Sequence, residues 1–267
     1  MVDLDHKKYV KTKNLGFTKM KKRSQKLIFK YDYLTSLQSV QINGERRYLY
    51  GDEKLPSVTT VLGKTKDQTF LDEWRKRIGE LEAEEIIFES STIGTALHKT
   101  VEFFLKNKML PAPKDTLVSK GYEMGYKIIN TYMKNFQEVW GSEVSIFYPG
   151  KYAGTIDAVG IYDGEPTVID FKQSKRQKKI EWVDDYFHQL AAYAMAHDKL
   201  YKTKITTGRV LMAVQDGTVQ EFVIRGNDLE NYKLKFMKRL EELLSQVPQP
   251  QDPVPPTTAL PKNERSI

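Results

Sequence analysis

Apolar residues recur at helical spacing through much of the first half of the chain. Two series have this period: Phe70, Trp74, Ile78 and Leu81, and then Leu97, Val101, Phe104 and Leu105. Each series places its apolar side chains on one face of a helix, and Pro111 and Pro113 end the second one. The same period continues over residues 119–140 and stops at Gly141. The pattern therefore predicts three amphipathic helices before residue 141.

The second half of the chain changes to short runs that are typical of β-strands. Strands are predicted near 143–148, 152–161, 166–172, 206–214 and 218–224, and helices near 183–199 and 228–247. Upstream, residues 39–56 contain Asn-Gly and Gly-Asp turn signals, which predict a hairpin or a pair of strands. Helices followed by three strands, a helix and further strands indicate a layered α/β domain.

Composition divides the chain into three parts. Residues 1–36 form a basic arm that we expect to be flexible, and residues 37–247 carry the periodic segments of one folded domain. Residues 248–267 are rich in proline and are expected to be disordered.

The composition also excludes several classes of protein and site. No apolar run approaches the roughly 18 residues of a membrane span, and the N-terminus lacks the apolar segment of a secretory signal, so we expect a soluble intracellular protein. The chain contains no cysteine, which excludes disulfides, zinc-cysteine sites and iron-sulfur clusters. Any metal ion would have to bind histidine or oxygen ligands.

The net charge of +7 is concentrated in two places. Residues 6–30 hold ten lysines and arginines and no acid, so the rest of the chain carries a net −3. A second basic cluster consists of Lys172, Lys175, Arg176, Lys178 and Lys179. Local positive charge of this kind favours contact with the phosphates of a nucleic acid and makes such binding salt-dependent.

Two acids occupy a predicted hairpin at positions where a buried strand normally carries apolar residues. If Asp163 and Gly164 form a two-residue turn, Asp157 lies directly opposite Asp170, with Lys172 on the same face. The two carboxylates would then repel each other at a separation of roughly 5 Å between Cβ atoms. A hard divalent cation such as Mg²⁺ or Mn²⁺ would offset that repulsion. Pairing of one acid with Lys172, or a turn that slips by one residue, is the alternative.

These residues resemble the metal-binding core of the PD-(D/E)XK nuclease superfamily. Asp157 is followed thirteen residues later by Asp170-Phe171-Lys172, which is an acid, any residue and a lysine. The pattern is short, but other motifs of RecB-like exonucleases stand in the expected order: His98 in GTALH, and Gln189 with Tyr193 as Q-x-x-x-Y.

Further segments extend the resemblance over about residues 45–225. PSVTTVL, YAGTIDAVG and FHQLAAYA are similar to segments of the exonucleases of mitochondrial genome maintenance and of bacteriophages. The family often has threonine after the lysine, whereas this chain has Gln173. The iron-sulfur branch of the superfamily needs cysteines that this chain lacks.

The resemblance implies a restriction-endonuclease-like α/β fold, with a central mixed sheet flanked by helices, an N-terminal helical region, and residues 37–247 as a RecB-like nuclease domain. It implies a Mg²⁺ or Mn²⁺ ion and a Lys172 that orients or activates the attacking water. The implied metal ligands are His98, Asp157, Asp170 and the backbone carbonyl of Phe171, with Glu143 as a further candidate.

Two of these ligands have a plain structural alternative. His98 lies at the border of an apolar helix face, where a histidine is often structural or exposed. Glu143 begins a strand and is equally consistent with an exposed acid.

The resemblance further implies DNA contacts. Gln189 and Tyr193 share one helix face and would orient the site and touch DNA, although Tyr193 is also consistent with core packing. Ser57 and Thr59 would present hydroxyls to phosphate, which is compatible with a role in capping a helix. The basic residues that would contact phosphate, rather than line a solvated loop, are Lys175, Arg176, Lys178 and Lys179. Candidate platforms for stacked bases, with core or surface roles equally open, are Tyr48, Tyr50 and Trp182.

The predicted function is that of a metal-dependent DNA exonuclease acting on single-stranded DNA or strand ends, in replication, recombination or degradation of DNA. A structure-specific endonuclease is the alternative within enzymes, and a DNA-binding module without chemistry is the alternative from another class. The phage-like resemblance leads us to expect the cytoplasm of an infected bacterium. A mitochondrial location is less expected, because Asp3 and Asp5 are unlike a transit peptide.

Overall fold

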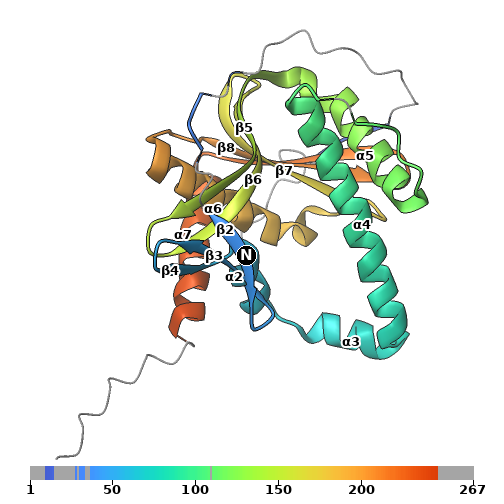
Figure 1. Cartoon of the computed structure of the whole chain (residues 1–267), viewed down its shortest axis with the longest axis horizontal. Helices are drawn as coiled ribbons and strands as arrows, with labels where there is room; N and C mark the ends of the chain where they lie inside the picture. The colour runs from blue at the N-terminus through green and yellow to red at the C-terminus, as the bar shows by residue number, and fades with distance from the viewer. Residues whose placement is uncertain (1–9, 15–27, 29, 34–36, 109, 246–267) are drawn as a thin grey trace, which may run out of the picture.

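The structure is a computed structural model that describes residues 10–14, 28, 30–33, 37–108 and 110–245 (Figure 1). Its centre is a six-stranded sheet with the strand order β1-β9-β8-β7-β6-β5. The strands are β1 (Val10–Asn14), β5 (Phe136–Tyr148), β6 (Tyr152–Tyr162), β7 (Glu165–Ser174), β8 (Thr207–Val214) and β9 (Thr218–Arg225). Neighbouring strands are antiparallel except β7 and β8, which are parallel, so the sheet is mixed.

Helices cover both faces of this sheet (Figure 1). One face packs against α4 (Glu80–Leu105) and α5 (Thr116–Tyr132), and the other packs against α2 (Val58–Lys64), α6 (Asp184–Tyr201) and α7 (Asn227–Ser245). The crossover through α6 returns the chain to the end of the sheet where β7 begins, so β8 runs parallel to β7. Each face therefore buries its own apolar core, in three layers.

A small three-stranded sheet stands beside the end of β6. It consists of β2 (Gln38–Ile42), β3 (Glu45–Tyr50) and β4 (Glu53–Pro56), in antiparallel order. Its buried Tyr48 and Leu55 pack against Phe147 and Ala153 of the main sheet. This contact brings the start of α2 to the edge of the central sheet.

The predicted third helix ends earlier than its sequence pattern indicates. Helix α5 stops at Tyr132, a 3-10 turn follows, and Phe136 already begins β5. Register shifts along the β5 and β6 pair interrupt the alternation of β5. Its buried Phe136, Val139 and Trp140 consequently fall three and four residues apart, which is helical spacing. The prediction of a helix to residue 140 is wrong for this reason.

The first two predicted helices are present but have different bounds. The structure has α3 (Thr69–Ile78) and then the long α4, which begins at Glu80. The side chains of Phe70 and Leu81 are 76% and 80% exposed, so the apolar series in this region does not face a core. Figure 1 shows α3 and the first half of α4 standing away from the sheet. None of the helices in the described residues has the length and apolar composition that a membrane crossing requires.

Parts of the predicted basic arm belong to the folded body. Val10–Asn14 pairs with β9 as an edge strand. The rings of Tyr31 and Tyr33 pack with His197, and Tyr31 also meets Trp140 edge to face. Within the arm, the structure describes residues 10–14, 28 and 30–33. The other residues of the arm and the predicted tail at 248–267 lie outside the described residues.

Close contact between α4 and α5 depends on glycine. A Cβ atom at Gly121 would lie 2.3 Å from the Ile93 backbone oxygen, whereas a Cβ atom at Gly94 would meet nothing within 4 Å. We therefore expect Gly121→Ala to destabilise the fold by about 2 kcal/mol. Gly94→Ala should stabilise it by about 1 kcal/mol, because alanine favours a helix. Urea unfolding of both variants checks this, and a similar effect of the two substitutions would contradict it.

Candidate active site

A cavity of about 250 Å³ lies where the small sheet, α4, α6 and strands β5, β6 and β7 meet. Most of the residues that line it are polar or charged. They include Ser57, Thr59, His98, Glu143, Asp157, Asp170, Lys172, Gln189 and Tyr193, all of which the sequence motifs had predicted.

The two acids of the hairpin lie where β6 and β7 separate. The turn at Asp163 and Gly164 has φ angles of 50° and 80°, and the paired residues follow the predicted register from Tyr162 with Glu165 to Ala158 with Ile169. Beyond that pair, Asp157 Oδ2 accepts a hydrogen bond of 2.7 Å from the Phe171 backbone N–H. The Asp157 carboxylate thus takes the place of a backbone carbonyl as the acceptor for Phe171 N–H. The regular pairing of β6 with β7 stops here, next to the cavity.

Glu143 joins the site through an unusual backbone conformation. Its neighbours Ser142 and Val144 pair with Ala158 and Ile156, which places Glu143 across from Asp157 on the adjacent strand. The φ angle of Glu143 is 51°, in the left-handed region that L residues seldom adopt. Such a conformation costs about 1–3 kcal/mol and is often found at functional sites.

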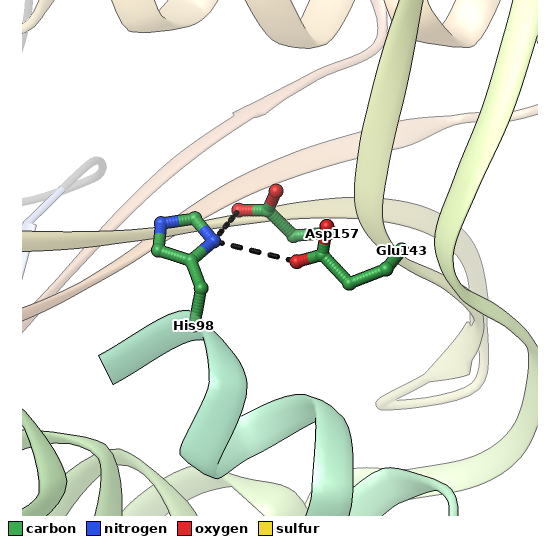
Figure 2. A group of neighbouring side chains, drawn as sticks. All are labelled: His98, Glu143 and Asp157. Carbon is green, nitrogen blue, oxygen red and sulfur yellow. Dashed lines mark ion pairs between the residues drawn. The ribbon is translucent and has the colours of Figure 1, made fainter. Parts of the chain in front are cut away.

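His98 reaches the site from α4, as Figure 2 shows. Its Nδ1 atom lies 3.4 Å from Asp157 Oδ2 and 3.5 Å from Glu143 Oε1. The ring also meets Phe171 edge to face, with 6.3 Å between centroids. The packing of α4 on the sheet therefore directs the imidazole at both carboxylates.

On the other side of the cavity, Asp170 and Lys172 form an ion pair held by α6. Lys172 Nζ lies 2.7 Å from Asp170 Oδ1 and 2.6 Å from Oδ2. Gln189 Nε2 donates to Asp170 Oδ1 over 2.9 Å, and Gln189 Oε1 lies 3.4 Å from Lys172 Nζ. Tyr193 OH then accepts from the Gln189 amide over 3.1 Å. The Q-x-x-x-Y pair thus positions the acid and the lysine.

Burial and charge shift the pKa values of this group in opposite directions. Burial raises the pKa of Asp170 to about 6, although the Lys172 charge opposes this. Burial also raises the pKa of Glu143. At His98 burial acts to lower the pKa, but the Asp157 charge and the contacts with both acids outweigh it and raise the pKa to about 10. Burial favours protonation of Asp157 as well, yet His98, Lys172 and the Phe171 N–H hold its pKa below the usual value.

The donor atoms of His98, Glu143 and Asp157 fit a divalent cation. Their ligating atoms all lie within 4.8 Å of one another. Two carboxylates and an imidazole suit Mn²⁺, and the carboxylates with water suit Mg²⁺. The donor chemistry of the site therefore agrees with a metal ion.

A second group of possible ligands, Asp184, Asp185 and His188, lies at the start of α6. Asp184 contacts His188 and accepts a hydrogen bond from Tyr232, and Asp185 pairs with Lys66 and Arg239. Because the surrounding cations and donors already satisfy these carboxylates, the group in the central cavity is the stronger candidate.

Comparisons with known proteins point to a nuclease family. A model of the PD-(D/E)XK nuclease superfamily matches residues 127–257, which include Asp157, Asp170 and Lys172. Residues 127–257 thus match the PD-(D/E)XK nuclease superfamily. The predicted fold, a mixed sheet flanked by helices around this motif, is confirmed.

Relatives of this chain include a curated group of exonucleases. The chain is 30% identical over 201 residues to human mitochondrial genome maintenance exonuclease 1, covering 70% of this chain and 58% of that protein. The mouse protein is 29% identical over 203 residues, covering 70% and 58%. The match thus spans a little over half of the curated relatives. The crystal structure of SSO0001 superimposes on 74% of this chain and 80% of its own with a TM-score of 0.40 and 15% identity, a likeness too weak to support an inference.

The residues predicted to contact DNA fall in two places. Ser57 lines the cavity and also caps α2, since its Oγ accepts from the Thr60 N–H over 2.9 Å. Thr59 is exposed at the same edge. The basic residues at 175–179 lie beyond the end of β7 and do not line the cavity. Their role in binding DNA stays a prediction, as does that of the Phe171 carbonyl in binding metal.

The candidate stacking platforms differ in exposure. Tyr48 is 2% exposed, and its OH lies 3.1 Å from Thr155 Oγ1, so its face is not open to a base. The ring of Tyr50 packs on Phe147 with 4.2 Å between centroids. Trp182 is 59% exposed and keeps an open surface.

The sequence analysis did not single out four residues that line the cavity, which are Arg46, Val58, Gly154 and Thr155. Gly154 lets Tyr193 approach, because a Cβ atom there would lie 2.6 Å from Tyr193 Cε1. Arg46 comes from β3, far from the motifs in sequence. A glycine shortly before Asp157 is a weak signal of close approach, but nothing in the sequence around Arg46 distinguishes it from Arg47.

Proposed function

We propose that this chain is a metal-dependent DNA exonuclease that hydrolyses phosphodiester bonds of single strands or strand ends. One observation carries the proposal: the Lys172 ammonium is held beside Asp170 in the same cavity where His98, Glu143 and Asp157 converge. A structural ion pair alone would not need three further ionisable groups around it. Asp157, Asp170 and Lys172 are the proposed catalytic residues.

The proposed roles follow from the contacts of each side chain. His98, Glu143 and Asp157 would hold Mg²⁺ or Mn²⁺, with Asp170 and the Phe171 carbonyl completing the site. The ion supplies a positive charge beside the scissile phosphate and lowers the pKa of a bound water. Lys172 would orient the attacking water and stabilise the charge that develops on the phosphate oxygens. Gln189 and Tyr193 keep the lysine and Asp170 in place.

Single strands or strand ends are the proposed substrate because of the resemblance to RecB-like exonucleases. The cavity of about 250 Å³ can take part of one nucleotide. Ser57, Thr59 and the basic residues Lys175, Arg176, Lys178 and Lys179 would contact the rest of the strand, with Gln189 and Tyr193 at its cleaved end. The proposed nuclease domain is residues 37–247.

The cellular role proposed for the chain is replication, recombination or degradation of DNA. Support comes from the motif set, and from relatives whose names refer to maintenance of the mitochondrial genome. The expected location in the cytoplasm of an infected bacterium stays a prediction.

Labelled DNA tests the proposed function. Strands labelled at the 5′ or the 3′ end, their duplexes and a circular single strand are incubated with Mg²⁺ or Mn²⁺, using wild type and Asp157→Asn. Progressive shortening of linear strands, with the circle spared and the variant inactive, is the expected result. It also reveals the polarity of cleavage.

Two other outcomes replace the proposal with its alternatives. Cutting of the circle by wild type would identify a structure-specific endonuclease. Binding of every substrate without cleavage under either metal would instead leave a DNA-binding module that has kept the fold.

A further inference from the structure

We propose that Arg46 binds a phosphate group of the DNA strand next to the bond that is cut. The inference rests on the nuclease function proposed above, and it adds a substrate contact that the motifs do not contain. Arg46 lies on β3 and lines the cavity together with Asp157, Asp170 and Lys172. Arg46 therefore adds a second cationic residue to this cavity, besides Lys172.

Arg46 stands at the boundary of the cavity and a neighbouring groove. The groove, of about 420 Å³, is lined by Thr59, Lys64 and Gln68 among others. Arg46 and Thr59 line both spaces. A strand that leaves the cavity on this side would pass close to Arg46 and Thr59, whose guanidinium and hydroxyl groups can donate hydrogen bonds to phosphate.

Among the residues that the structure describes, no carboxylate forms an ion pair with Arg46. The next residue behaves differently, because Arg47 donates to Glu45 Oε2 over 3.0 Å and lies 3.4 Å from the Lys54 carbonyl oxygen. The two neighbouring arginines of β3 therefore differ. Arg46 lines the cavity, whereas Arg47 does not line it and is paired with Glu45.

The position of Arg46 is fixed without using its hydrogen-bond donors. Its guanidinium carbon lies 5.2 Å from the centre of the buried Tyr48 ring, which is a cation–π contact. Its backbone carbonyl accepts hydrogen bonds from the Ser57 N–H, at 3.2 Å, and the Thr60 hydroxyl, at 2.9 Å. An arginine held in this way offers its planar donors to two phosphate oxygens at once.

Binding of short fluorescent oligothymidines tests the inference, with Ca²⁺ in place of Mg²⁺ to suppress cleavage. Fluorescence anisotropy gives the Kd at salt concentrations between about 50 and 200 mM. Arg46→Gln should raise the Kd about tenfold and reduce the slope of log K against log salt by about 0.7. Arg46→Lys should restore part of the slope, and the control Arg47→Gln should change the Kd less than about twofold.

A comparison of oligonucleotides with a 5′-hydroxyl and a 5′-phosphate end identifies which phosphate Arg46 binds. A loss of affinity that is equal for 5′-hydroxyl and 5′-phosphate strands indicates an internal phosphodiester, and a loss confined to the 5′-phosphate strand indicates a terminal phosphate. If Arg46→Gln matches Arg47→Gln in both Kd and slope, the inference is wrong.

Cleavage by wild type with Mg²⁺, measured on the same preparations, separates this inference from the proposed function. Active wild type with an unaffected Arg46→Gln overturns only the phosphate contact. Inactive wild type with weakened binding in Arg46→Gln overturns only the nuclease. Wild type that binds no DNA overturns both.

Discussion

Replacing Lys172 with methionine is expected to slow DNA cleavage by about a thousandfold while strand binding stays within a few-fold of wild type. The methionine keeps the length of the side chain but removes the ammonium group that lies 2.6 Å from Asp170 Oδ2 and 3.4 Å from Gln189 Oε1. Without that charge, the site loses the group that we propose to orient the attacking water and to stabilise the phosphate oxygens in the transition state. Single-turnover cleavage with excess enzyme measures the effect on the chemical step.

Two control variants distinguish a loss of catalysis in Lys172→Met from a loss of folding. Lys172→Arg keeps the positive charge beside buried Asp170, yet its planar guanidinium cannot take the place of an ammonium, so cleavage should still fall at least about tenfold. Lys204→Met removes an exposed lysine that does not line the cavity and should leave the cleavage step unchanged. Wild-type cleavage rates in Lys172→Met, with its thermal unfolding unchanged, would remove Lys172 from the catalytic group.

Acid is expected to weaken the fold through His197 by about 3 kcal/mol between pH 7 and pH 4. His197 is fully buried, its ring stacks on Trp140, and its nitrogens lie 3.0 Å from Tyr33 OH and 2.8 Å from Thr203 Oγ1. Burial lowers its pKa from 6.5 to about 4. The unfolded chain therefore binds the proton first as pH falls. The stability from neutral His197 is complete above pH 6.5 and is lost as pH approaches 4.

Urea unfolding of wild type and His197→Gln at several pH values isolates this contribution. Glutamine carries no charge across the range, so the other titrating groups cancel when the two proteins are compared. The unfolding free energy of wild type should fall by about 3 kcal/mol relative to the variant between pH 7 and 4. A constant difference would show that His197 does not titrate differently in the folded and unfolded chain.

The sequence by itself determined the features that depend on neighbouring residues. The order of helices and strands from residue 143 onward follows from local periodicity, and the Asp163-Gly164 turn sets the register that places Ala158 opposite Ile169. The motif residues could likewise be chosen in advance, because their spacing along one hairpin and one helix already places them on common faces.

The tertiary structure alone decided where those local patterns are broken. The bulged start of β5 imitates a helix, and α4 begins among exposed residues that carry no core signal. Contacts between distant segments determine the rest of the site. The packing of α4 directs His98 at Asp157, the left-handed Glu143 faces the same point, and the small sheet carries Arg46 to the cavity. Periodicity indicates which face of an element is buried, but it does not indicate which other element covers that face. A site assembled from several elements depends on that second fact.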